Sequence, residues 1–355
     1  MLNNGLNKDI NCYFKDFKII DVNKSYNVAS IRNNNKEELL NNLIECACVQ
    51  ALDSENKILN KNNLSISIDN ILKNYSFCSY YAIKDNYSNI VSSIMLYDEY
   101  DIINNINIKW IGNVVVKREY RRKKIFSKII VPHVIKSIKN ESDLLFNKTI
   151  LKLMVENDNS IAVKAYEKCG FKPMDNIVIL GKETNNIDCN NIDKLINYDN
   201  NSYNIEEINM YNINELITFI LKNNFYNYIN KIDLSDTCKS SLYKSVHEVV
   251  KDFYKGKFIV IYSNKLNNYI GLFYISYEPS DWKNSLNWYV FNIYVNTMFL
   301  DCFNKDIDII IESMIKYHIS KNGKSIRFLS LKDNIKDYNS SCLDIKNYTI
   351  YLKDI

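Results

Sequence analysis

Glycine and proline are scarce in this chain, whose 355 residues include only 7 glycines and 3 prolines. Both residues normally mark turns and element ends, because glycine tolerates positive φ angles and proline cannot donate a backbone hydrogen bond. Most of the usual turn signals are therefore missing, and the elements are predicted mainly from hydrophobic periodicity.

Long apolar runs are also lacking. No stretch approaches the roughly 18 residues of a membrane-spanning helix, and the N-terminal sequence MLNNGLNKDINCYFKDF has no apolar core of a signal peptide. Hydrophobic residues make up 46% of the chain and charged residues 24%, which is typical of a soluble globular protein. We expect a cytoplasmic protein of two domains with no membrane partner.

A large charge of either sign is absent. The chain has 45 lysines and arginines against 41 aspartates and glutamates, which leaves a formal net charge of +4. So small an excess does not imply a polyanionic partner, and we expect no nucleic acid among the partners.

Clustered metal ligands are absent as well. The nine cysteines include no CxxC pair, and His133, His247 and His318 lie far apart in the sequence. Zinc sites normally show closely spaced pairs of such residues. We therefore expect no metal site, reduced and mostly buried thiols, and core or surface roles for His133 and His318.

The N-terminal half alternates between strand and helix patterns. Strands are predicted from β-branched and aromatic residues between polar turns, and helices from apolar residues three and four apart. In order, the pattern predicts a strand at 17–22, helices within 36–52 and 65–75, strands at 79–84, 90–97 and 108–116, a helix at 125–140, a strand at 150–156, a helix at 160–169 and a strand at 176–182. Pro132 should bend its helix. This order predicts an α+β domain with a mixed sheet, which the strand at 176–182 completes.

The segment Asn185–Ser202 is polar and poor in large apolar residues, which is typical of a linker. We place the domain boundary there. The first domain is predicted at 1–184, the linker at 185–202 and the second domain at 203–355.

The second half resembles the first in a fixed register. Tyr277–Val295 aligns without gaps on Asp98–Val116, at a constant offset of 179 residues (278 − 99 = 179). The segments on either side repeat the same pattern of strands and helix. We interpret this as a tandem duplication, with two unrelated halves that share a strand pattern as the alternative.

The stretch VVVKREYRRKKIF, Val114–Phe126, joins a predicted strand to a predicted helix through six positive charges. A nucleic-acid patch, a solvated surface and a phosphate-binding loop are all open interpretations. The first N–H groups of a helix lack intrahelical partners, so a basic loop that opens directly into a helix suits phosphate. A nucleic-acid surface normally adds interleaved aromatic residues, and only Tyr120 is present. We therefore favour the phosphate loop.

Two segments, YRRKKIFSKII and LKLMVENDNSIAVKAYEKCGF, resemble the signature segments of the GNAT superfamily of N-acetyltransferases. The first signature has the form Arg/Gln-x-x-Gly-x-Gly/Ala. Arg121 matches it, whereas Lys124 and Phe126 stand at the two glycine positions. The second signature, Asn-x-x-Ala-x-x-x-Tyr-Glu-Lys-x-Gly-Phe, is matched without a gap from Asn159 to Phe171. The resemblance implies two tandem acyl-CoA N-acyltransferase (GNAT) domains, each a mostly antiparallel twisted sheet flanked by helices.

The resemblance also implies acetyl-CoA as co-substrate and no metal. The end of the central strand would pair with the pantetheine arm, the loop amides would hold the pyrophosphate, and Asn159 would lie near the pantetheine. The implied cofactor-binding residues are Val114, Val115, Val116, Arg121, Arg122, Lys123, Lys124, Ile125, Phe126, Ser127, Asn159 and Ala162.

The implied reaction is direct attack of an amine on the thioester. Tyr166 is implied as the general acid for the departing thiolate, with a core aromatic as the competing interpretation. For the general base we choose Glu99, with Asp98 and Asp101 as alternatives and a solvated acidic turn as the competing interpretation. The acceptor is expected to be a primary amine of a small molecule or peptide, and the chain a monomer or a homodimer.

The second half departs from the family pattern where the chemistry should lie. Its counterpart of the basic loop, NTMFLDCFNKDID, has no arginine and contains Asp301, Asp306 and Asp308, whose charges would repel pyrophosphate. We predict a degenerate GNAT-like domain beside a catalytic first domain.

Three alternatives stay open. The chain could be an acyltransferase that prefers a longer or different acyl-CoA. Both halves could have decayed into a non-catalytic acyl-CoA-binding or protein-interaction module. The second half could also supply a wall of the acceptor pocket, although core packing explains its aromatic residues more simply. The aromatic residues concerned are Trp282, Trp288, Tyr289 and Phe291.

Overall fold

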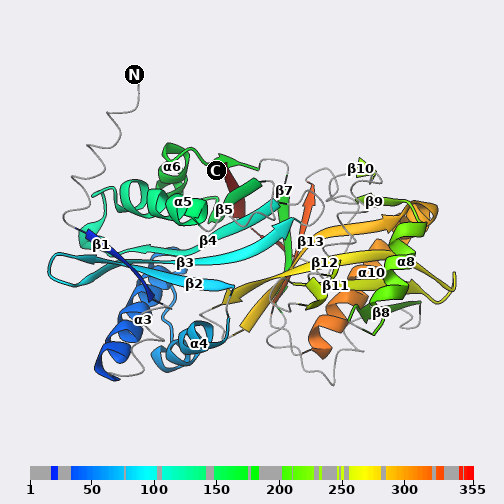
Figure 1. Cartoon of the computed structure of the whole chain (residues 1–355), viewed down its shortest axis with the longest axis horizontal. Coiled ribbons are helices and arrows are strands. Elements are labelled where there is room, and N and C mark those ends of the chain that lie inside the picture. The colour runs from blue at the N-terminus through cyan, green and yellow to red at the C-terminus, as the bar shows by residue number, and fades with distance from the viewer. Residues whose placement is uncertain are drawn as a thin grey trace.

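The described strands of the chain form two sheets that lie side by side, each with helices packed on it (Figure 1). Among the described residues no helix is at once long and apolar enough to cross a membrane. The computed structural model of the chain describes residues 17–22, 33–75, 77–101, 106–140, 148–174, 177–183, 202–209, 211–227, 232–233, 246–247, 249–251, 256–280, 285–321, 325–331, 344–346 and 348–355.

The first sheet has seven strands in the order β1-β2-β3-β4-β5-β16-β6. All its pairings are antiparallel except that of β4 with β5, which is parallel. The strands are β1 (Phe17–Asp21), β2 (Cys78–Asp85), β3 (Ile90–Asp101), β4 (Ile106–Val116), β5 (Lys148–Glu156), β6 (Lys172–Pro173) and β16 (Tyr348–Asp354).

Helices cover both faces of this sheet (Figure 1). Side chains along β2 alternate, because successive residues of a strand point to opposite faces: Tyr80 packs in one buried cluster and Tyr81 in the other. The helices on the Tyr80 face are α3 (Asn33–Glu55) and α4 (Lys61–Asn74), and those on the Tyr81 face are the π-helical turn η3 (Phe126–Ile130) with α5 (Val131–Asn140), and α6 (Ser160–Lys168).

The elements predicted for the first half are confirmed within a few residues at their ends. The helix predicted at 125–140 differs in type over its first turn. It begins as the π-helical turn η3, which ends shortly before Pro132. Proline has no N–H for the α-helical ladder, and a π-helical turn is one of the irregularities that accommodate such a break.

The second sheet has nine strands. Seven follow the order β15-β7-β14-β13-β12-β11-β8, and β9 pairs with both β13 and β10. The strands are β7 (Ile177–Glu183), β8 (Tyr203–Glu207), β9 (Phe225–Asn227), β10 (Ile232–Asp233), β11 (Lys257–Ser263), β12 (Asn268–Ser280), β13 (Ser285–Asn296), β14 (Ser325–Leu331) and β15 (Asp344–Lys346), and the helices are α8 (Ile213–Lys222) and α10 (Leu300–Ser320).

The structure confirms the register of the repeat. Strands β3 and β12 end at Asp101 and Ser280, which differ by 179 residues (280 − 101 = 179). The short 3-10 helices η2 (Arg118–Tyr120) and η6 (Thr297–Phe299) differ by the same offset (297 − 118 = 179). The two halves therefore repeat one arrangement of strands, turn and helix, as the sequence alignment predicted.

Each half gives its last strand to the sheet of the other half. Strand β7 pairs with β14 and β15 in the second sheet, while β16 lies between β5 and β6 in the first. Figure 1 shows the exchange as a green strand in the right-hand sheet and a dark red strand in the left-hand one. The expectation that the strand at 176–182 completes the first sheet is therefore wrong.

The predicted domain boundaries stay a prediction, because residues 184–201 lie outside the described part of the chain. Because of the strand exchange, each of the ranges 1–184 and 203–355 contributes one strand to the sheet of the other range.

A buried polar cluster joins the two sheets. The Tyr97 hydroxyl on β3 donates to Oε1 of Glu278 on β12 over 3.3 Å. Arg327 on β14 holds Glu278 in an ion pair at 3.4 Å and donates to the hydroxyl of Tyr289. Removing one partner of a buried ion pair leaves an uncompensated charge, so this cluster fixes how the two sheets meet.

His318 on α10 confirms the core role expected for it. Its ring is fully buried and lies edge-on to Trp288, with 4.4 Å between the ring centroids. Neither ring nitrogen has a hydrogen-bond partner among the described residues. Burial, together with the nearby charge of Lys257, lowers the pKa of His318 to about 3. The folded chain therefore keeps this imidazole neutral at ordinary pH.

This burial makes stability sensitive to acid. The unfolded chain binds a proton at His318 below about pH 6.5, whereas the folded chain does so only near pH 3. Stability conferred by the neutral ring is thus lost between those values as the pH falls, by up to about 1.4 kcal/mol per pH unit. Urea unfolding of the parent and of His318→Phe from pH 7 to pH 4 measures this loss of stability. We expect the parent to lose stability relative to His318→Phe; a constant difference would contradict the buried neutral state.

Candidate functional site

Strands β4 and β5 run together only as far as Ile111 and Leu153. Beyond that point, within the described residues, no strand pairs with the edge of β4 that faces β5. The backbone of Gly112–Val116 therefore has a sheet partner, β3, on one side only. The Val116 carbonyl accepts a hydrogen bond from Nε of Arg121 over 2.9 Å. The remaining edge can pair with an extended ligand that carries amide groups.

A β-bulge causes this divergence. Asn113 and Val114 both stand opposite Ile94 on β3, where a regular ladder would place one residue. Asn113 has a φ angle of 48°, the left-handed conformation that asparagine adopts more readily than most residues. A bulge bends its strand, so β4 turns away from β5 at this point.

The basic loop after β4 has an anion-binding backbone. Arg122 and Lys124 have φ angles of 65° and 60°, while the flanking Arg121 and Ile125 have −65° and −54°. Alternating negative and positive φ angles can turn successive N–H groups towards one point, as in the concave nests that bind anions. We refer to Arg121–Ile125 as the nest. Helix η3 follows directly, and the N–H groups of its first turn, which lack intrahelical partners, add further donors for an anion beside the loop. Lys124 thus keeps the left-handed backbone that glycine provides in the family pattern.

The charges of the loop divide into two groups. Asp53 on α3 pairs with Arg118 at 2.5 Å and with Arg121. Burial raises the pKa of Asp53, but its hydrogen bonds to these two arginines outweigh burial and place that pKa below the usual range. No described acidic residue pairs with Arg122, Lys123 or Lys124 in the same way, so their charges remain for a ligand. No pattern in the sequence indicated that Asp53 would lie here.

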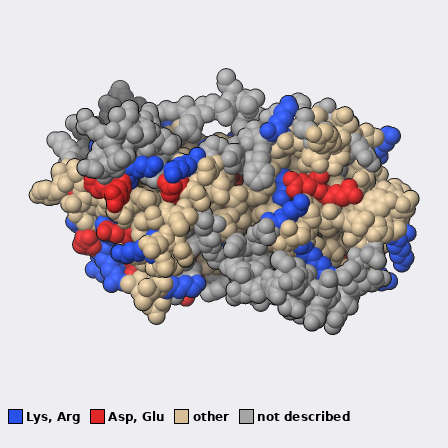
Figure 2. All heavy atoms as spheres, turned by 90° about the horizontal axis from the view of Figure 1, so that it is seen from below, with Lys and Arg blue, Asp and Glu red and all other residues tan. Residues whose placement is uncertain are grey.

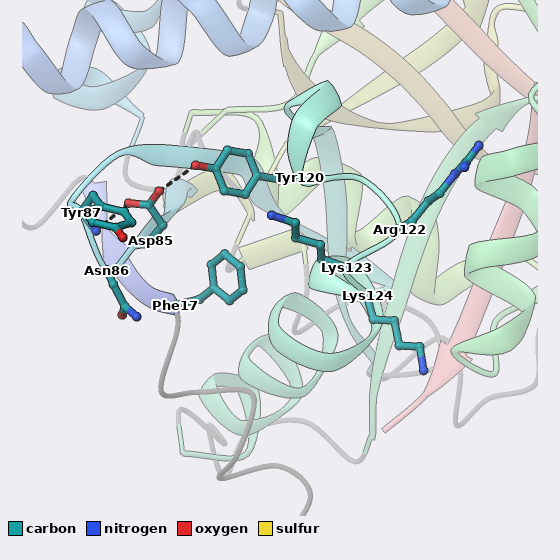
Figure 3. A pocket seen from close by; sticks show the side chains of 8 residues that line it. All are labelled: Phe17, Asp85, Asn86, Tyr87, Tyr120, Arg122, Lys123 and Lys124. Carbon is teal, nitrogen blue, oxygen red and sulfur yellow. Dashed lines mark hydrogen bonds between the residues drawn. The ribbon is translucent and has the colours of Figure 1, made fainter.

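A hollow of about 550 Å³ lies beside the loop (Figure 3). The Tyr120 hydroxyl donates to Asp85 over 2.7 Å, and Nζ of Lys123 lies 4.5 Å from the centre of the Tyr120 ring. Figure 3 shows Arg122 pointing away from this hollow. The loop cations therefore do not all point into this hollow. The lining residues are Phe17, Asp85, Asn86, Tyr87, Tyr120, Arg122, Lys123 and Lys124.

Helix α6 is defined by residues of the second signature. The Asn159 side chain accepts a hydrogen bond from the Ala162 amide over 3.1 Å and so caps the helix N-terminus. Gly170 follows the helix with a φ angle of 82°, and a Cβ there would lie 2.8 Å from Nζ of Lys353. The motif residues Asn159 and Gly170 therefore begin and end this helix. The contact of Asn159 with pantetheine stays a prediction.

Tyr166 lies on the buried face of α6 at 9% exposure. Its ring packs edge-on against Phe126 of the loop, with 5.1 Å between centroids, and near Phe171 and Tyr351 at 6.3 and 6.5 Å. Burial, and to a lesser extent Cys169, raises the pKa of Tyr166 to about 12. The phenol is therefore protonated at neutral pH, and its hydroxyl makes no hydrogen bond to a described residue.

The remaining predicted cofactor residues surround these groups. Ile125 is buried in the cluster that contains Tyr166, and Val114, Val116, Phe126 and Ala162 pack partly buried against it. Val115 is the exception, because it is buried in the cluster on the opposite face, with Tyr80. The Ser127 hydroxyl donates to the Lys124 carbonyl over 3.3 Å. The structure thus brings the loop, the free edge of β4 and Tyr166 together on one side of the sheet. Whether each residue touches a cofactor stays a prediction.

Glu99 lies apart from this group. It is 3% exposed, accepts a hydrogen bond from Nε1 of Trp110, and pairs with Lys152 at 3.5 Å. Trp110 packs in the cluster beneath α3 and α4, whereas Tyr166 belongs to the cluster on the opposite face. The sheet therefore separates the two residues predicted to be catalytic.

The environment of Glu99 recurs in the second half. Glu278 and Tyr289 stand 179 residues after Glu99 and Trp110. Arg327 pairs with Tyr289 across β13 and β14 as Lys152 pairs with Trp110 across β4 and β5. A carboxylate, an aromatic ring and a cation thus recur in both sheets. This repetition gives Glu99 a structural role that does not depend on catalysis.

The two alternative bases, Asp98 and Asp101, lie on β3. Asp98 pairs with Lys109 at 2.6 Å, and the side chain of Asp101 lies outside the described part. Among the described residues no group of three or more histidine, cysteine or acidic side chains could hold a metal ion.

The second half differs from the first where its central strands diverge. β13 pairs with β14 only from Trp288 to Val290, as β4 does with β5. The edge beyond that point is occupied, because β9 pairs with Tyr294–Asn296. Strand β12 already holds the other edge of β13 over these residues, so β9 must lie on the side facing β14. The chain itself therefore fills the place that stays open in the first half.

The loop of the second half also lacks a nest. Thr297–Phe299 leads directly into α10, and no residue from 285 to 321, all of which the structure describes, has a positive φ angle. Asp301 stands in the first turn of α10, and Asp306 accepts a hydrogen bond from Tyr203 at 2.5 Å. This helix start therefore offers neither the backbone nor the charge of the first loop.

Comparison with known proteins agrees with this geometry. Residues 47–171 match the model of the acetyltransferase (GNAT) family, which spans the divergent strands, the loop and α6. No curated protein matched the chain.

Solved structures extend the likeness to both halves. A tandem GNAT protein from the clavulanic acid biosynthesis pathway is 8% identical with a TM-score of 0.51, covering 96% of this chain and 98% of that one. A GCN5-related N-acetyltransferase from Sphaerobacter thermophilus is 7% identical with a TM-score of 0.52, covering 89% of this chain and 91% of that one.

A third structure is a GCN5-related glucosamine N-acetyltransferase region of a fungal multi-domain β-N-acetylglucosaminidase, 12% identical with a TM-score of 0.56 over 95% of this chain. This chain spans 38% of the length of that protein. At such identities the likeness concerns the fold. The family match therefore concerns residues 47–171, and the likeness in fold to a tandem GNAT protein extends over both halves.

Proposed function

We propose that the chain transfers an acetyl group from acetyl-CoA to a primary amine of a small molecule or peptide, at the first half and by direct attack. GNAT proteins bind acyl-CoA, and the groups expected to hold it lie together here. The nest of Arg121–Ile125 would take the pyrophosphate. The free edge of Gly112–Val116 would pair with the pantetheine amides, and a backbone N–H there would polarise the thioester carbonyl.

The observation that carries the proposal is the contrast between β4 and β13. Both strands leave their parallel neighbour, but only β13 is paired again, by β9. Its loop also places Asp301 where the first half has cations. We therefore assign the activity to the first half and a structural part to the second.

Tyr166 is the proposed donor to the departing sulfur. The amine nitrogen bonds to the carbonyl carbon, the carbon–sulfur bond breaks, and its electron pair stays on sulfur. A phenol with a pKa of about 12 is always protonated at neutral pH, yet full transfer to a thiolate with a pKa near 8.5 is uphill. Tyr166 would therefore act mainly by hydrogen bonding to the developing thiolate.

Glu99 remains the proposed general base, through water. It stands opposite Ile108 on β4, four residues before Gly112, or about 13 Å along the strand. The amine proton would have to cross that distance by a water relay. Lys152 pairs with the Glu99 carboxylate at 3.5 Å.

The surface supports a small acceptor. On the face drawn in Figure 2, the described lysines and arginines alternate with aspartates and glutamates. Nucleic-acid binding normally requires a continuous basic surface, which the described part of this face does not offer. The three related structures named above include a glucosamine N-acetyltransferase region, so amino sugars belong in the first panel of acceptors.

Titration calorimetry of acetyl-CoA into the whole chain tests the assignment to one half. We expect one site per chain, because β9 pairs with β13 beyond Val290, whereas no strand in the described part of the chain pairs with the edge of β4 that faces β5 beyond Ile111. Arg122→Glu reverses a charge beside the nest and should weaken binding at least tenfold. Lys305→Glu, an exposed change on α10, should leave it unaltered. Two sites, or a site sensitive to Lys305→Glu, would contradict the assignment. Absence of binding would favour a non-catalytic interaction module.

Removing the Tyr166 hydroxyl separates binding from chemistry. Tyr166→Phe should bind acetyl-CoA as the parent does and lower kcat by at least tenfold, since a lost proton donor typically costs two to four orders of magnitude. CoA release, followed chromatographically with a panel of amines, measures kcat. Tyr317→Phe removes a hydroxyl from the second half and is the control. Equal kcat for Tyr166→Phe and the parent would refute the role of the hydroxyl.

A further inference from the structure

The exchanged strand β16 holds the helix that bears Tyr166. It pairs with β5 along all seven of its residues and with β6 at Tyr351 and Leu352, so it bridges the strands on either side of α6 in the sequence. The Met174 amide also donates to the Ile350 carbonyl over 2.8 Å. The segment that carries α6 is therefore anchored to the last strand of the chain.

Two side chains on one face of β16 contact α6. Residues two apart in a strand share a face, and Tyr351 and Lys353 are such a pair. The Tyr351 ring is 6% exposed and packs 6.5 Å from the Tyr166 ring. Nζ of Lys353 donates to the Cys169 carbonyl at the end of α6 over 2.7 Å. A cation also stabilises a helix C-terminus through the helix dipole.

These contacts shield the Tyr166 ring from water. The titratable groups packed around it are Cys169 on its own helix and Tyr351 and Lys353 on β16. The remaining neighbours, Phe126 and Phe171, are apolar. Tyr351 is thus the part of this enclosure that the second half of the chain supplies.

We propose that Tyr351 is a positioning residue for Tyr166, so that catalysis in the first half depends on the last strand of the second. This inference rests on the proposed function for its catalytic part. The strand exchange then has a functional consequence, because separating the halves would remove a wall of the active site.

Tyrosinate absorbance tests the positioning without any assay of activity. Subtracting the pH titration of Tyr166→Phe from that of the parent isolates the ionisation of Tyr166. We expect no ionisation below the pH at which circular dichroism reports unfolding. Subtracting the titration of the double variant Tyr351→Ala/Tyr166→Phe from that of Tyr351→Ala isolates the ionisation of Tyr166 in the absence of the Tyr351 ring. This ionisation should lie nearer pH 10, because water reaches the Tyr166 ring. Tyr351→Phe keeps the ring and should match the parent.

A matched control separates positioning from loss of stability. Tyr80→Ala removes a buried ring from the opposite face of the same sheet and should lower stability without changing the titration of Tyr166. An unchanged titration in Tyr351→Ala, or an equal change in Tyr80→Ala, would overturn the proposal.

Kinetics then test the catalytic consequence. Tyr351→Ala should lower kcat at least tenfold with the KM for acetyl-CoA within about threefold, because the loop and β4 are untouched, and Tyr351→Phe should restore kcat. Equal losses in kcat and binding would overturn a positioning role. A parent that releases no CoA with any amine would refute the proposed function, while the absorbance titration would still decide whether Tyr351 encloses Tyr166.

Discussion

The site depends on one backbone constraint, the β-bulge at Asn113 and Val114. A strand inside a sheet satisfies its N–H and C=O groups on both edges, so it has none left for a ligand. The bulge separates β4 from β5 after Ile111 and leaves the edge of Gly112–Val116 without a strand partner in the described part. The basic loop follows at the end of that same edge, so a single bend brings together the groups that we propose to bind pantetheine and pyrophosphate.

The two halves share one arrangement of strands but differ at the edge of their central strand. Both have central strands that diverge, but β9 restores the sheet beside β13 in the second half. The second half then contributes through contacts with the first: Tyr97 meets Glu278 between the sheets, and Tyr351 lies against Tyr166. A domain that no longer offers an open edge can thus remain necessary, because the sheet of its neighbour contains one of its strands.

Much of the fold could be predicted from the sequence, because hydrophobic periodicity is a local signal and the 179-residue repeat can be found by aligning the two halves. The exchange of β7 and β16 could not, since residues 177–183 would suit either sheet, and only tertiary packing chooses between them. The three-residue β9 is too short to show a pattern. For the site, the motif located the loop and Tyr166. It did not reveal that Asp53 pairs with Arg118 and Arg121, because that contact joins distant parts of the chain.

Backbone hydrogen exchange with and without acetyl-CoA tests the central claim most directly. The account predicts that acetyl-CoA slows exchange in residues 112–116 and 122–126, where free N–H groups would acquire partners. Residues 294–296 of β13 should exchange slowly in both states, because β9 and β12 already occupy both edges. Protection that arises at 294–296 and not at 112–116 would contradict the account.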